Sequence, residues 1–101
     1  MKKRYVTPGG YGIIPRWLRN LMWYLWESMN ESERGDFQSF SLYSDSETLR
    51  VEHSQKQPPY HKVILIPSEG ETVCTKIIIL EKRDSWVMML ESEYEGGLKD
   101  E

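Results

Sequence analysis

The stretch PRWLRNLMWYLWESM, residues 15–29, decides the fold, because its apolar side chains recur at intervals of three and four residues. This spacing places them on one face of an α-helix. Pro15 suits the first helical position, because a backbone N–H at that position has no hydrogen-bond partner within the helix. The pattern predicts an amphipathic helix that begins at Pro15 and ends between Met29 and Arg34, with Gly35 as its stop. The predicted apolar face consists of Leu18, Leu21, Met22, Leu25 and Met29.

Outward from the helix, the apolar period becomes alternating, which is typical of strands. Upstream, residues 4–7 predict a short strand and Pro8-Gly9-Gly10 a turn. Downstream, five strands are expected in residues 36–42, 47–54, 61–66, 73–80 and 86–90. Short links between them favour an antiparallel sheet. The predicted class is α+β: one amphipathic helix packed on a mostly antiparallel β-sheet of about five to six strands. We expect a single domain over residues 1–95 and a flexible acidic tail at residues 96–101.

Composition narrows the function classes. The chain of 101 residues has a net charge of −3, so it lacks the basic footprint of a nucleic-acid binder. It has one cysteine, Cys74, so no internal disulfide is expected and a cytoplasmic location fits best. No apolar run approaches the roughly 20 residues that span a bilayer, so a membrane protein is not expected.

Residues for catalysis or metal binding are few. Nucleophilic catalysis would need Cys74 or a serine beside a base, and the bases on offer are His53 and His61. Cys74 is expected to be a small buried residue, and His53 to pack against the core. The three residues match no standard zinc spacing. We therefore predict no catalytic residues, no metal and no cofactor. An enzyme with His53 as its base in a scattered site is an alternative that no spacing supports.

The helix carries one anomaly. Trp23 projects away from the apolar face, near Arg16 and Arg19, where solvent is expected. Trp and Arg are enriched in binding hot spots. Either Trp23 is exposed for a partner, or the N-terminal segment or the acidic tail covers it. The predicted partner-binding residues are Trp23, Trp26, Arg16 and Arg19, with Glu91, Glu93 and Glu95 of the acidic end.

Several strings resemble a known family. They are Arg4–Thr7, Ile14-Pro15 with Leu18 and Met22-Trp23, Asp36–Leu42, His53–Gln55, Pro59-Tyr60 with Lys62, Met88–Leu90, and Glu93-Tyr94. In order and spacing the chain resembles the family catalogued as domain of unknown function 960, from streptococci, enterococci, staphylococci and their mobile elements. The resemblance implies a single α+β domain and no established activity. The polar string around His53, Gln55 and Tyr60 is interpreted as a structural corner, with a binding site as the alternative.

These observations predict a non-catalytic protein–protein interaction module. The version that the resemblance implies is a phage or mobile-element accessory protein that modulates or inhibits a host protein, such as a CRISPR nuclease with a basic groove. A single-stranded nucleic-acid binder that uses Tyr5, Trp86 and Lys2–Arg4 is one alternative, and an orphan structural domain is another. An uncovered second sheet face bearing apolar residues of 77–80 and 86–90 would favour a homodimer.

Overall fold

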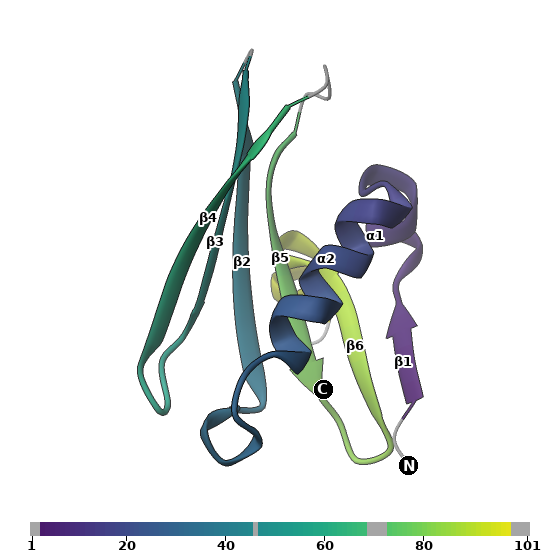
Figure 1. Cartoon of the computed structure of the whole chain (residues 1–101). Helices are drawn as coiled ribbons and strands as arrows, with labels where there is room; N and C mark the ends of the chain where they lie inside the picture. The colour runs from purple at the N-terminus through teal and green to yellow at the C-terminus, as the bar shows by residue number, and fades with distance from the viewer. Residues whose placement is uncertain (1–2, 46, 69–72, 98–101) are drawn as a thin grey trace.

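The computed structural model describes residues 3–45, 47–68 and 73–97, and Figure 1 shows how the elements are arranged. In chain order they are β1 (Lys3–Val6), α1 (Pro8–Ile13), α2 (Arg16–Glu27), the 3-10 helix η1 (Glu31–Glu33), β2 (Phe37–Ser44), β3 (Thr48–Gln55), β4 (Tyr60–Pro67), β5 (Cys74–Glu81), β6 (Ser85–Leu90) and α3 (Glu91–Gly97).

The strands form one sheet in the order β1-β6-β5-β2-β3-β4. β1 runs parallel to β6, whereas all other neighbouring pairs are antiparallel. The two hairpins β2–β3 and β5–β6 pack side by side through β2 and β5, so β4 and β1 become the two edges (Figure 1). The chain is therefore an α+β protein with a mostly antiparallel sheet, as the sequence predicts.

The sheet is covered unequally on its two faces. α2 lies across one face, where its apolar side chains join Phe40, Val51, Ile77 and Met88 in the core (Figure 1). α3 lies behind the opposite face and contacts β5 and β6. Ile78 and Met89 on this second face are 1% and 2% exposed. The apolar residues of β5 and β6 are thus covered, and the condition under which the sequence favours a homodimer is not met there.

The predicted turn at residues 8–10 is wrong, because these residues begin the short helix α1. The Thr7 Oγ accepts a hydrogen bond from the Gly10 N–H at 3.3 Å and so caps this helix. Pro8 occupies its first turn, where proline costs no hydrogen bond. Thr7 followed by Pro8 is typical of a helix start, whereas Gly9 and Gly10 favour a turn. The prediction of a turn rested on the two glycines.

The long helix ends earlier than predicted, at Glu27. The Ser28 hydroxyl donates to the Tyr24 carbonyl oxygen at 2.8 Å, and Asn30 then caps η1. Gly35 is therefore not the helix stop. At the other end of the chain, α3 extends to Gly97. Residues 98–101 of the predicted tail lie outside the described residues. No helix in the described ranges is long and apolar enough to cross a membrane.

Candidate functional site

Three tryptophans, two from α2 and one from β6, pack against one another. Trp26 of α2 packs edge-on against Trp23, with ring centres 5.5 Å apart, and against Trp86 of β6 at 4.7 Å. All three are buried: Trp23 and Trp86 are 8% exposed and Trp26 is 5% exposed. Trp23 is therefore not the solvent-facing hot spot that the sequence left open. The N-terminal strand covers it, which was the other alternative.

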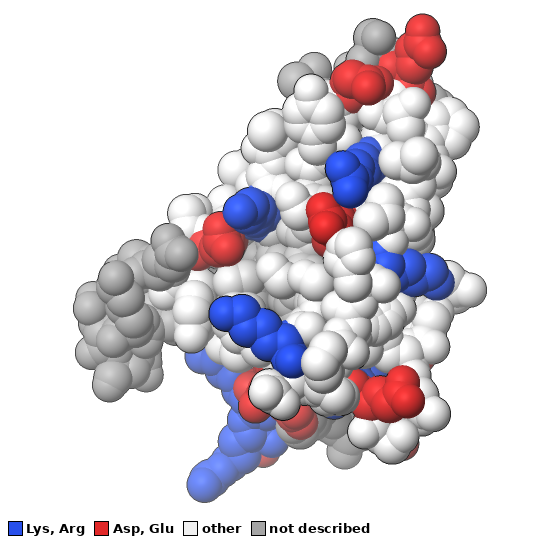
Figure 2. All heavy atoms as spheres, turned by 90° about the vertical axis from the view of Figure 1, so that its left-hand side faces the viewer, with Lys and Arg blue, Asp and Glu red and all other residues white. Residues whose placement is uncertain are grey.

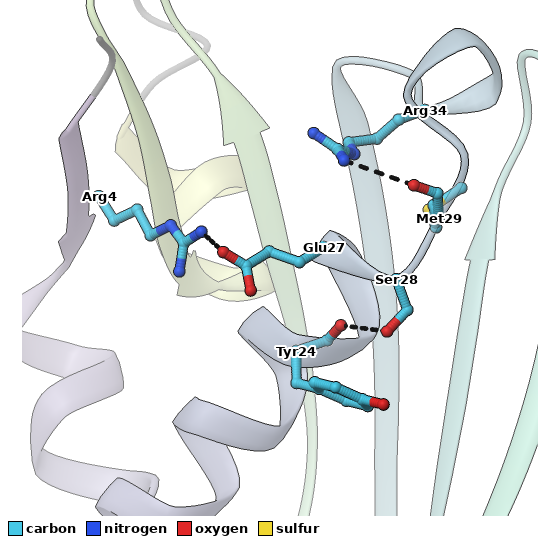
Figure 3. Close-up of polar contacts among 6 residues, drawn as sticks. All are labelled: Arg4, Tyr24, Glu27, Ser28, Met29 and Arg34. Atoms are coloured by element: carbon cyan, nitrogen blue, oxygen red, sulfur yellow. Dashed lines mark hydrogen bonds and ion pairs between the residues drawn. The ribbon is translucent and has the colours of Figure 1, made fainter.

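Arginines close this tryptophan cluster. The Arg4 guanidinium carbon lies 5.3 Å from the Trp23 ring centre and 5.0 Å from that of Trp26. Arg34 covers Trp26 at 4.4 Å and donates to the Met29 carbonyl oxygen (Figure 3). Figure 3 also shows Arg4 of β1 reaching Glu27 at the end of α2 with an ion pair. The cluster thus fastens β1 and the η1 segment to α2, which is a structural task.

A cavity of about 1050 Å³ opens beside the cluster and brings together four residues of the nucleic-acid alternative, whose Lys2 lies outside the described residues. Its walls are Lys3, Arg4, Tyr5, Trp26, Glu31, Arg34, Glu81 and Trp86. Base stacking needs an exposed aromatic face. Trp26 and Trp86 are almost fully buried, and an arginine covers the Trp26 ring, whereas Tyr5 is 51% exposed. Tyr5 is therefore the one aromatic ring of this wall that is open to a base, which is a weak platform for single-strand binding.

The two arginines predicted beside Trp23 have different surroundings. Arg19 is 9% exposed, donates to the Tyr11 carbonyl oxygen at 3.2 Å and lies 4.0 Å from the Tyr11 ring centre. It therefore holds α1 against α2. Arg16 is exposed at the start of α2. The structure does not assemble these residues into one exposed patch with Trp23 and Trp26.

The acidic residues predicted near the end of the chain are not all exposed to solvent. Glu93 is half-buried, and its Oε1 accepts hydrogen bonds from the Thr7 hydroxyl at 2.6 Å and the Leu90 N–H at 2.9 Å. A glutamate that reaches back to the N–H before its helix is one half of a capping box. Because Thr7 in turn caps α1, Glu93 links the starts of two helices. Glu91 and Glu95 lie in the same helix, α3.

We expect Glu93→Ala to lower the free energy of unfolding by about 1–2 kcal/mol, since it removes a helix cap and one partner of Thr7. Chemical denaturation monitored by circular dichroism measures this. Glu93→Gln keeps an acceptor oxygen and should recover much of the loss. Equal stability of Glu93→Ala and wild type would show that this contact contributes nothing.

The predicted polar corner is a buried hydrogen-bond network. The His53 Nε2–H donates to Gln38 Oε1 at 2.8 Å, and the Gln38 amide nitrogen donates to Gln55 and to the Gly35 carbonyl oxygen. Gln55 also accepts from the Gly35 N–H at 2.8 Å. Its amide nitrogen donates to the carbonyl oxygens of Glu33 and Pro58, both at 2.7 Å. The network joins two loops to the sheet.

Gly35 belongs to this corner through close approach. A Cβ atom there would lie 2.5 Å from the Gln57 carbonyl oxygen, so a larger residue would push the two loops apart. Tyr60 completes the corner, with its ring centre 5.0 Å from that of His53. These contacts agree with the interpretation of His53, Gln55 and Tyr60 as a structural corner.

His53 has surroundings that keep it neutral. It is 1% exposed and stacks on Phe40, with ring centres 4.3 Å apart. Burial, together with the charge of Lys62, lowers the pKa of His53 to about 4. The expected packing of His53 against the core is confirmed.

The other candidates for chemistry lie apart. Cys74 is exposed at the start of β5, so the prediction of a buried cysteine is wrong. It lies opposite Tyr43 of β2, on the less covered face of the sheet. Within residues 3–45, 47–68 and 73–97, no three His, Cys, Asp or Glu side chains gather as a metal site would require.

Another surface feature is the sheet face opposite α2 on β2, β3 and β4, which we call the open face. Cross-strand register places its side chains in rows, one of which runs Tyr43–Arg50–Leu65. Tyr43 is 53% exposed, Leu65 64% and Val63 40%. Large apolar side chains that gather on one exposed surface mark interaction sites. The open face consists of Ser39, Ser41, Tyr43, Arg50, Glu52, Ser54, His61, Val63 and Leu65.

Charged side chains on the open face interact with one another through a hydrogen bond and an ion pair. Glu52 accepts a hydrogen bond from His61 Nε2 at 2.5 Å and lies 3.7 Å from an Arg50 nitrogen. The hydrogen bond from His61 is the main reason why the pKa of Glu52 is lowered. These groups give the face a defined polar stripe beside its apolar side chains.

A hollow of about 670 Å³ extends the open face toward α3. Ser39 and Ser54 belong to both, and Phe37 and Glu91 form the side nearest α3. The Phe37 ring packs edge-on against Tyr94 of α3, with centres 5.4 Å apart. The remaining walls are Asp36, Gln55, Lys56 and Gln57. The open face is therefore apolar at one end and hollow and polar at the other.

Sequence reasoning missed the open face. Its exposed residues lie on three strands and alternate with core residues. The prediction used this alternation only to identify the buried side of each strand. The predicted strand over residues 36–42 ends before Tyr43, although Tyr43 is paired with Arg50 and Cys74 inside the sheet. The signal that could have found the face is the pair Val63 and Leu65, which alternates with Ile64 and Ile66 in an apolar run.

The fold and these sites define a small α+β protein with a buried polar network and an exposed sheet face. The chain matches the family model described as "Staphylococcal protein of unknown function (DUF960)" over residues 3–93, and it belongs to that family.

A solved structure shares the fold. It is the crystal structure of a protein of unknown function from Enterococcus faecalis, with a TM-score of 0.78 and 19% sequence identity. The match covers 91% of this chain and 90% of that one. No curated protein matches.

Proposed function

We propose that this chain is a non-catalytic protein-binding module and that a partner protein docks on its open face. The observation that carries the proposal is the exposure of Tyr43, Val63 and Leu65 on the sheet face opposite the core, away from Phe37, where Tyr94 of α3 packs. Tyrosine and other aromatic residues are enriched in interfaces because they combine large apolar area with a polar end.

The open face offers a partner two kinds of contact. Tyr43 and Leu65 provide apolar area at one end, on either side of the Arg50 side chain. Ser39 and Ser54 provide hydroxyl groups at the entrance of the hollow. We expect the partner to place an apolar side chain near Tyr43 and a polar group in the hollow.

A more specific form of this proposal is that the chain modulates a host protein. One example is inhibition of a nuclease that has a basic groove. The net charge of −3 supports this version, because an acidic protein is steered toward a basic surface. A cleavage assay with excess protein tests it. Unchanged nuclease activity would count against the inhibitor form and would leave the docking proposal standing.

Two tyrosines provide a matched test of the docking surface. Tyr43 is 53% exposed on the open face, and Tyr24 is 64% exposed on α2. We expect Tyr43→Ala to weaken capture of a host protein at least tenfold, since truncation of an interface hot spot costs about 2 kcal/mol. Tyr24→Ala should leave capture unchanged. Affinity capture from host lysate, followed by titration of the captured protein, measures both.

Circular dichroism and thermal unfolding of both variants confirm that each is folded. Loss of capture in Tyr24→Ala with normal capture by Tyr43→Ala would contradict the proposed surface. Equal capture by both variants would also contradict it.

A further inference from the structure

The two edges of the sheet differ in how they are protected. β1 is short, with four residues, and carries Lys3 and Arg4. β4 has eight residues, and in the described sheet it pairs only with β3. Proteins protect edge strands by shortness, by charges or by covering segments. β1 has the first two protections. β4 has Lys62 and Pro67 near its ends, but its centre over residues 63–66 is apolar and carries no charge.

An edge of this kind can pair with the same edge of a second copy. In an antiparallel pair related by a two-fold axis, the same residue lies at the centre on both chains. Because side chains alternate between faces, the two open faces then lie on one side and the two α2 helices on the other. Pairing therefore joins the two open faces into one surface.

The side chains of β4 favour Ile64 as the central residue. This register places Ile64 opposite Ile64 of the second copy and Val63 opposite Leu65. Lys62 then lies opposite Ile66 and four positions away from the Lys62 of the other copy, so no like charges face each other. Figure 2 shows the side on which β4 lies, where charges of both signs are scattered among uncharged residues.

We propose that two copies of this chain associate through their β4 strands, antiparallel about Ile64, into one continuous sheet. A ladder over residues 61–67 buries less area than the roughly 1,200–2,000 Å² of a standard interface. The dimer therefore depends on protein concentration. This inference rests on the backbone edge of β4 rather than on the docking of another protein, although Val63 and Leu65 also belong to the open face.

Charge substitutions at the paired positions test both the dimer and its register. V63E/L65E places like charges opposite each other twice, so we expect only the monomer. V63K/L65E places opposite charges at the same two positions and should restore the dimer. Sedimentation velocity over a range of concentrations measures the mass, which for the wild type should rise toward twice the 12.0 kDa of one chain.

Hydrogen exchange of the wild type provides a measurement that needs no variant. The backbone amides of residues 61–67 should exchange more slowly at high than at low protein concentration. A wild type that stays monomeric at every concentration would overturn the proposal, and so would a dimeric V63E/L65E. Failure of V63K/L65E to restore the dimer would overturn the register and the proposal with it. Slowed exchange only on addition of a different protein would identify a foreign strand as the occupant instead. Tyr43 lies two strands away from this edge, so its variant separates the two proposals.

Discussion

Trp26→Ala lowers the free energy of unfolding by about 3–5 kcal/mol, the range for removal of a buried tryptophan. Trp26 is 5% exposed and is the side chain through which the cluster is connected. It packs against both Trp23 and Trp86, and both Arg4 and Arg34 lie over its ring. Small domains are stable by only about 5–15 kcal/mol, so this one change removes a large share. Urea denaturation followed by far-ultraviolet circular dichroism measures the loss.

Trp17→Ala is the matched control, because Trp17 lies on the same helix and is 43% exposed. It should cost under about 1 kcal/mol, as exposed substitutions do. If Trp26→Ala cost no more than Trp17→Ala, the cluster would not be the anchor between α2, β1 and β6.

Acid destabilises this protein through His53. In the folded chain the pKa of His53 is about 4, whereas an unfolded histidine titrates near 6.5. The unfolded state therefore binds the proton first as the pH falls. Titration of His53 leaves the free energy of unfolding unchanged above pH 6.5 and lowers it as the pH falls from 6.5 to about 4. Below about pH 4 the residue causes no further loss. The difference between the two pKa values corresponds to a loss of about 3 kcal/mol in the free energy of unfolding.

His53→Gln isolates this effect, because glutamine does not titrate and its amide N–H can still donate to Gln38. The free energy of unfolding is measured by urea titration at a series of pH values for both proteins. Carboxylates contribute equally to both curves, so the difference between them reports His53. We expect the wild type to lose stability more steeply from pH 6.5 downward. Parallel curves would mean that His53 is not held neutral in the folded chain.

The sequence predicted the class of the fold because its two periodicities are clear. The spacing from Leu18 to Leu25 predicts one helix face, and alternation around Phe40 and Val51 predicts strands with a buried side. Both depend on local pattern alone, which a single sequence displays. The parallel pairing of β1 with β6 could not be predicted, because it joins segments more than 80 residues apart.

The surroundings of Trp23 and Glu93 could not be predicted, for one physical reason. Helical geometry places Trp23 away from the apolar face of α2, but it does not reveal that Arg4 of another element lies over that ring. In the same way, Glu93 belongs to an acidic run, and its partner Thr7 is 86 positions away. Contacts between distant segments convert residues that appear solvated in the sequence into buried ones.

The open face was missed for the opposite reason. Its residues are ordinary surface residues one by one, and only the register of β2, β3 and β4 brings Tyr43 and Leu65 into one row. The sequence placed the interaction surface on α2 and the acidic end instead. The structure moves the proposed surface to the other side of the sheet, away from the tryptophans.

Photo-crosslinking at two tyrosine positions tests the central claim most directly. Benzoylphenylalanine replaces Tyr43 in one sample and Tyr24 in the other, so both samples carry the same probe on exposed positions. The proposal predicts that irradiation in host cells links the probe at position 43 to a partner protein and leaves the probe at position 24 without that product. Crosslinks to the same protein from position 24 and none from position 43 would contradict docking on the open face.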